Sequence, residues 1–118
     1  MINILANDGI SVSGIEILNK NGFHVETTSV SQEELADSIN KNNFEVVLVR
    51  SATKIRKDII DKCPNLKIIG RGGVGMDNID VKYAEQNNIL VINTPAASSS
   101  SVAELVFAHL FGMVRFLY

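Results

Sequence analysis

The chain has 118 residues, 46% of them hydrophobic and 20% charged, with a formal net charge of −2. The length predicts one domain, and the composition excludes a disordered chain. The charge argues against a nucleic-acid surface, and the lone cysteine, Cys63, excludes an internal disulfide or a multi-cysteine metal site. No ligand spacing predicts a metal. The apolar start, Ile2–Leu5, is too short for a signal-peptide core, so we expect a cytoplasmic protein.

Short apolar runs alternate with helical patterns along the chain. Val46–Val49 is apolar throughout, as in a parallel strand covered on both faces, whereas Phe23–Thr27 alternates as at a sheet edge. Ser31 and Glu34 have the spacing of a capping box, and Asn21-Gly22 is typical of a helix end. The predicted strands are Ile2–Leu5, Phe23–Thr27, Glu45–Val49, Leu66–Ile69 and Ile89–Ile92. The predicted helices follow them, at Ile10–Leu18, from Leu35, at Lys57–Lys62, from a cap at Asp80, and from Val102.

This order of elements predicts an α/β fold, a flavodoxin-like doubly wound parallel sheet of five strands in the order 2-1-3-4-5, with a protruding C-terminal helix. Ligands of such sheets bind beyond the carboxyl ends of the strands. We expect three loops to meet there, Asn7–Gly9, Arg50–Thr53 and the glycine-rich loop Gly70–Asp80.

The glycine-rich loop carries four glycines within six residues and an arginine, Arg71. Such a loop offers backbone N–H groups to an anion, and arginine adds a fork of donors. A plain tight turn is the structural alternative. Because Arg50 also follows a predicted strand at the same edge of the sheet, we interpret the pair as a clamp for a carboxylate or phosphate.

The same glycines fit the spacing G-x-G-x-x-G, which is typical of dinucleotide sites, but two features argue against that function. Met76–Asp80 has turn and cap chemistry, so the next helix starts too late to face a pyrophosphate. The place of the ribose-binding acid is taken by Asn93-Thr94-Pro95.

Four ordered motifs, Val49–Lys54, Gly70–Asp80, Ile92–Pro95 and Ser101–Leu105, resemble the amino-terminal part of the D-isomer-specific 2-hydroxyacid dehydrogenases. The resemblance covers nearly the whole chain. It implies a two-domain enzyme that oxidises a small-molecule 2-hydroxy acid with NAD, the cofactor being bound mainly by a domain that this chain lacks. The family's catalytic residues and cofactor glycine motif would follow residue 118, so the resemblance places no catalytic residue here and implies that the fragment is inactive.

The resemblance also implies roles for individual residues. Arg50 and Ser51 would line the substrate site, and the backbone around Gly73, Val74 and Gly75 would receive the substrate carboxylate. Arg71 would serve a phosphate at the other end of the substrate. On the cofactor side the implied residues are Val74, Ser98 and Val102, although many relatives have asparagine at the position of Ser98.

The predicted domains are a substrate-binding domain, 1–97, and a segment, 98–118, that contains a serine linker and the start of a crossover helix into the missing NAD domain. From Val102 to Tyr118 only Glu104, His109, Gly112 and Arg115 are not apolar. A helix that is apolar all round needs cover on several sides, of which the domain before it would supply one. The run is too short and too often interrupted for a membrane span. We therefore expect a homo-oligomer through Val102–Tyr118 in the isolated chain.

A stand-alone flavodoxin-like module that binds an anion or transmits a signal is the alternative function. A phosphorylated receiver needs acids after its first strand and an aspartate after its third. Asp8 fits the first position, but Arg50 occupies the second.

Overall fold

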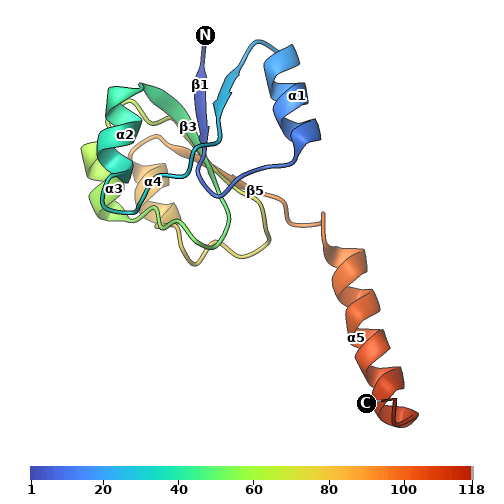
Figure 1. The fold of residues 1–118 in the computed structure, drawn as a ribbon. Helices are drawn as coiled ribbons and strands as arrows, with labels where there is room; N and C mark the ends of the chain where they lie inside the picture. The colour runs from blue at the N-terminus through green and yellow to red at the C-terminus, as the bar shows by residue number, and fades with distance from the viewer. Residues whose placement is uncertain (118) are drawn as a thin grey trace.

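The computed structural model describes residues 1–117, in which five parallel strands form one sheet in the order β2-β1-β3-β4-β5 (Figure 1). The predicted fold and strand order are confirmed. The strands are β1 (Asn3–Ala6), β2 (His24–Glu26), β3 (Phe44–Val49), β4 (Ile68–Arg71) and β5 (Leu90–Asn93). The helices are α1 (Val12–Lys20), α2 (Leu35–Lys41), α3 (Lys57–Lys62), α4 (Val81–Gln86) and α5 (Ser99–Val114).

The two faces of the sheet are covered unequally. Helices α2, α3 and α4 lie on one face, where Leu5, Val47 and Ile69 pair across three neighbouring strands and are fully buried (Figure 1). Helix α1 lies on the other face, beside β2. Because strand side chains alternate between faces, Leu90 and Ile92 of β5 belong to that second face, and they are 58% and 48% exposed. An apolar strip over β5 therefore faces solvent.

Local hydrogen bonds explain where several elements begin and end. Gly22 has φ +84°, and the N–H of Phe23 donates to the carbonyl of Leu18 at 3.1 Å, which confirms the predicted cap of α1. The predicted capping box is only partly formed. The Ser31 hydroxyl bonds the Glu34 carboxylate at 3.2 Å instead of a backbone N–H, and α2 begins at Leu35.

Asp80 precedes α4, but its side chain serves another helix. It makes no side-chain cap bond to α4, so that part of the prediction is wrong. The carboxylate instead accepts from the N–H of Lys57 at 2.8 Å and from Arg56 Nη1 at 3.2 Å. A carboxylate is favourable there, because the first N–H groups of α3 lack internal partners.

Several predicted boundaries shift in the structure, and two of these shifts bear on the site. Strand β4 does not end at Ile69 but continues through Gly70 and Arg71, which pair with β3 and β5. A Cβ at Gly70 would lie 2.7 Å from Leu48 Cδ2, so glycine allows close packing on the neighbouring strand. Helix α5 begins at Ser99 and not at Val102, because three of the serines form its first turn.

Helix α5 leads away from the sheet (Figure 1). Every residue in it is exposed except Gly112, so the expectation that the domain covers one side of this helix is wrong. Tyr118, at the end of the predicted oligomer segment, lies outside the described residues. Among the described residues, no helix has the length and apolarity needed to cross a membrane.

Cys63 offers a test of the core. Its side chain is 1% exposed, and burial, which disfavours the thiolate, raises the pKa of the thiol to about 11. We expect iodoacetamide to label this thiol slowly near neutral pH and rapidly once urea unfolds the chain, as followed by mass spectrometry. Equal rates in the folded and unfolded chain would contradict this packing.

Candidate anion-binding site

A cavity of about 310 Å³ lies at the carboxyl ends of β1, β3, β4 and β5. Gly9, Arg50 and Gly72 line it together, one from each of the three predicted loops. Arg71 lines it too, so both predicted clamp arginines contact one cavity. This is the edge of the sheet at which ligands of doubly wound folds bind.

Asp8, directly after β1, fixes the loop that carries Arg50. Its carboxylate accepts from the N–H of Arg50 at 2.7 Å, from the N–H of Thr53 at 3.2 Å and from the Thr53 hydroxyl at 2.6 Å. Burial alone raises the pKa of Asp8, but the hydrogen bonds from Thr53 and Arg50, together with the Arg50 charge, outweigh it and lower the pKa below its ordinary 3.8. The loop geometry therefore depends on an ionised Asp8.

This bond set predicts a pH-dependent contribution to stability. A carboxyl whose pKa is lowered on folding stabilises the fold at pH values above its unfolded pKa, and the contribution is lost as the pH falls through the lower folded value. We expect Asp8→Asn to lower the free energy of unfolding near neutral pH, and the difference from wild type to shrink as the pH falls below 3.8. Urea titrations at several pH values measure this. A difference that stays constant with pH would contradict it.

Three buried polar residues, Asn7, Thr53 and Asn78, lie behind the cavity and are the buried polar residues of the described chain. Asn7 Nδ2 donates to the Thr53 hydroxyl at 2.9 Å. Asn78 Nδ2 donates to the carbonyls of Arg50 at 2.8 Å and Thr53 at 2.6 Å, and Asn78 Oδ1 accepts from Arg71 Nη1. The sequence prediction missed this network, because asparagine and aspartate in loops are also ordinary turn residues.

The two arginines differ in exposure and in the contacts of their side chains. Arg71 is 14% exposed in its side chain, and Nη1 also contacts Asp77 at 3.2 Å. Its Nε is buried and has no acceptor among the described residues. Arg50 is exposed, and only its backbone is held by Asp8 and Asn78. The cavity thus combines one fixed guanidinium with one that extends into solvent.

The glycine-rich loop leaves part of its backbone open. The N–H of Gly72 donates to Val49 at 2.9 Å, and that of Gly73 to Arg71 at 3.1 Å. The N–H groups of Val74 and Gly75 have no acceptor among the described residues. The end of β5 braces this loop, since Asn93 Nδ2 donates to the Val74 carbonyl at 2.8 Å. Two amides, those of Val74 and Gly75, are therefore available to an anion.

The loop glycines serve close approach and not unusual backbone angles. In the part of the chain that the structure describes, the glycines with positive φ are Gly9 and Gly22. A Cβ at Gly73 would lie 3.3 Å from Arg71 Nε, tighter than most real contacts. The glycine lets the guanidinium pack against the loop.

The geometry also excludes a dinucleotide fingerprint in this loop. After the glycines, Ile79 bridges to Ile55, and α4 begins only at Val81. No helix N-terminus follows the glycines directly, as the fingerprint requires. Asn93, where an acid would bind ribose, contacts the loop backbone.

The remaining predicted residues lie around the cavity or outside it. Ser51 is exposed, and its hydroxyl has no partner among the described residues. Val74 is 55% exposed. Ser98 precedes α5 without making a side-chain cap, and Val102 is 56% exposed on that helix. The lining of the cavity includes Arg50 and Arg71 but not the other predicted site residues, Ser51, Gly73, Val74, Gly75, Ser98 and Val102.

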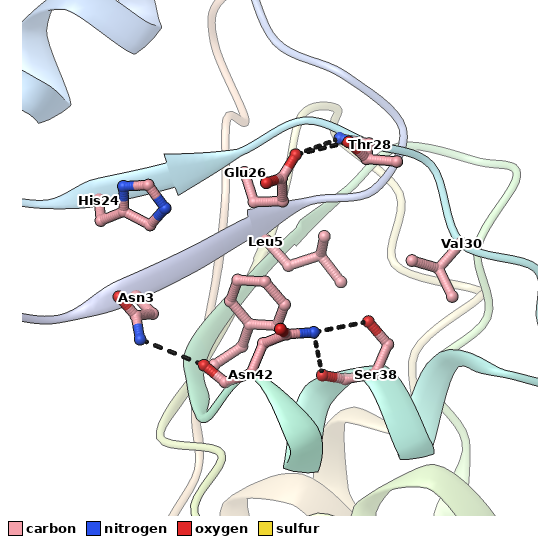
Figure 2. Close-up of a pocket in the computed structure, with 9 residues that line it drawn as sticks. Asn3, Leu5, His24, Glu26, Thr28, Val30, Ser38 and Asn42 are labelled. Atoms are coloured by element: carbon pink, nitrogen blue, oxygen red, sulfur yellow. Dashed lines mark hydrogen bonds between the residues drawn. The ribbon is translucent and has the colours of Figure 1, made fainter.

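A larger hollow of about 460 Å³ lies between β2 and α2 (Figure 2). Several polar groups around it bond to one another. Glu26 accepts from the Thr28 hydroxyl at 2.6 Å, and Asn42 Nδ2 donates to the Ser38 carbonyl at 3.0 Å (Figure 2). The pKa of Glu26 is lowered, chiefly by the Thr28 hydroxyl. Because no arginine or lysine lines this hollow, the cavity at the strand ends is the candidate site.

The fold and site define an α/β domain with two arginines at one cavity on the carboxyl edge of its sheet. The chain belongs to the D-isomer-specific 2-hydroxyacid dehydrogenase family, whose catalytic-domain model matches residues 4–115. It is 43% identical over 115 residues to D-3-phosphoglycerate dehydrogenase of Methanocaldococcus jannaschii, covering 98% of this chain and 22% of that protein. It is 42% identical over 110 residues to hydroxypyruvate reductase of Thermotoga maritima, covering 92% of this chain and 35% of that protein.

A solved relative shows the same fold. NAD⁺-bound 3-phosphoglycerate dehydrogenase of Entamoeba histolytica superposes with a TM-score of 0.77 at 31% identity, covering 94% of this chain and 38% of that one. The chain thus spans about a fifth to two fifths of the length of these relatives.

Proposed function

We propose that this chain is the substrate-binding domain of an NAD-dependent D-2-hydroxyacid dehydrogenase, and that its substrate is 3-phosphoglycerate, whose oxidation leads toward serine. One observation carries the proposal: two arginines line one cavity, and two open backbone amides lie in the loop that follows Arg71. A hydroxy acid with two anionic groups requires such a pair of positive groups. The identity to D-3-phosphoglycerate dehydrogenase supports the choice of substrate.

Each predicted site residue has a role in this proposal. The N–H groups of Val74 and Gly75 receive the substrate carboxylate, and Gly73 shapes the turn before them. Arg50 and Ser51 bind the substrate from the neighbouring loop. Arg71 binds the phosphate, and its buried Nε supplies a donor that the chain itself does not satisfy. These groups bind and orient the acid, and proton transfer belongs to residues beyond this chain.

The cofactor belongs mainly to another part of the enzyme. NAD accepts the hydride in this chemistry, and the residues of this chain do not fit as its main site, because the glycine loop lacks a following helix N-terminus. Val74, Ser98 and Val102 are proposed as contacts on the cofactor side only. The proposed boundary places the substrate domain at 1–97 and the crossover segment at 98–118. The exposed apolar surfaces of α5 and of Leu90 and Ile92 support packing against a further domain.

The experiment uses the full-length protein. We expect it to reduce NAD with 3-phosphoglycerate and to use D-glycerate, which lacks the phosphate, with a much lower kcat/KM. Equal use of both acids would refute the phosphate role of Arg71 and favour a smaller substrate, and no activity with either would refute the proposed substrate. The 118-residue chain alone is expected to show no activity and no tight NAD binding by calorimetry.

The alternative, a stand-alone signalling module, receives less support from the geometry. A receiver needs its first-strand acid free for a metal ion. Asp8 instead accepts three hydrogen bonds from the loop after β3, through both of its carboxylate oxygens.

A further inference from the structure

We propose that Asn78 is a positioning residue that holds the Arg50 loop and Arg71 in one arrangement for the substrate anion. This inference rests on the proposed function. Asn78 is 5% exposed and lies behind the cavity, so it acts through its neighbours and does not touch the substrate. Its amide bonds to three groups on two loops.

The chemistry of the amide explains why this residue suits the position. An asparagine side chain has two N–H donors and one carbonyl acceptor on one small group. The donors bind the carbonyls of Arg50 and Thr53, which are the two ends of one loop. The acceptor binds the Arg71 guanidinium. An aspartate would keep the contact to Arg71 but place negative charge against two carbonyl oxygens. An alanine would remove the donors to both carbonyls and leave Arg71 Nη1 with Asp77 as its partner.

Asn78 complements the anchor that Asp8 provides. Asp8 holds the N–H groups of Arg50 and Thr53, and Asn78 holds their carbonyl groups. The loop is therefore fixed from both sides of its backbone. Asn78 contacts Arg71 as well, so it joins both arginines of the proposed clamp. Losing it should displace Arg50 and Arg71 together.

The test uses full-length enzyme with Asn78→Asp and Asn78→Ala. The aspartate variant is nearly isosteric and serves as the second variant if the alanine variant fails to fold. The matched control is Asn40→Ala, since Asn40 Nδ2 also bonds a distant carbonyl, that of Lys62 at 2.8 Å, away from the cavity. We expect both Asn78 variants to raise KM for the hydroxy acid about tenfold or more, with KM for NAD little changed. The Asn40→Ala control should leave both KM values unchanged.

A double-mutant cycle separates positioning from general destabilisation. If Asn78 acts through Arg71, the combined loss in Arg71→Ala/Asn78→Ala should be smaller than the product of the two single losses. A combined fold-loss in kcat/KM equal to the product of the two single fold-losses would overturn the coupling to Arg71.

Hydrogen exchange supplies a readout that does not need activity. We expect the backbone amides of Arg50 and Thr53 to exchange faster in both Asn78 variants than in wild type or in Asn40→Ala. Unchanged exchange at both amides overturns the proposal whatever the activity, and so does an unchanged KM in an active enzyme. If wild-type enzyme oxidises no 2-hydroxy acid, the proposed function fails, and the exchange rates alone decide whether Asn78 positions the loop.

Discussion

Replacing Arg50 with alanine in the full-length enzyme is expected to lower kcat/KM for the hydroxy acid about 10- to 100-fold, because a charge-assisted hydrogen bond to the substrate anion is lost. The backbone of Arg50 is held by Asp8 and Asn78, whereas its side chain is exposed at the cavity. The substitution should therefore leave the loop and the fold intact. Steady-state kinetics with varied acid and saturating NAD measure the effect.

Two further variants test the reason for this loss. Arg50→Lys keeps the charge but not the planar fork, so we expect an intermediate kcat/KM. Lys41→Ala, at the end of α2 before β3, removes one positive charge at the opposite edge of the sheet and should leave kcat/KM unchanged. An Arg50→Ala enzyme with wild-type kinetics would rule out the assigned role, and an equal loss in Lys41→Ala would indicate a general charge effect.

The sheet could be predicted because its signals are local. The apolar run at Val46–Val49 and the cap at Gly22 depend on neighbouring residues, and the structure confirms both. The end of β4 shifted because it depends on a distant contact. Gly70 continues β4 because it fits against Leu48 of β3, a contact that glycine's low strand preference hides from the sequence.

The site was predictable in outline and not in detail. Topology places loops that follow parallel strands at one edge of a sheet, so the meeting of Arg50 and Arg71 could be predicted from strand order alone. The hydrogen-bond network of Asn7, Thr53 and Asn78 behind the two arginines could not be predicted in this way. Asn7 contacts Thr53 across 46 residues, and Asn78 contacts the Arg50 carbonyl across 28. A buried asparagine is recognised by its partners, which a sequence pattern does not display.

The second large effect concerns α5, and we expect the isolated 118-residue chain to self-associate through it. The helix exposes apolar side chains around its circumference. This is more contiguous apolar surface than a monomeric protein usually exposes to water. Phe107 and Phe111 stack with ring centroids 6.2 Å apart and are more than half exposed. The large apolar residues that α5 exposes are Val102, Leu105, Val106, Phe107, Leu110, Phe111, Met113 and Val114. Light scattering coupled to size exclusion should show a mass above 12.9 kDa that rises with concentration.

Charged substitutions locate the contact. Phe107→Glu with Leu110→Glu should shift the chain to a monomer, because two carboxylates on the helix would have to lose their hydration in any packed interface. Ile17→Glu is the control, since Ile17 is 61% exposed on α1 and also apolar, yet lies on the body of the domain. A wild-type chain that stays monomeric with α5 helical by NMR would overturn the proposal. If Ile17→Glu alone gave the monomer, the interface would lie on α1. In the full-length enzyme we expect the same α5 surface to be protected from hydrogen exchange by the proposed further domain or by a second subunit.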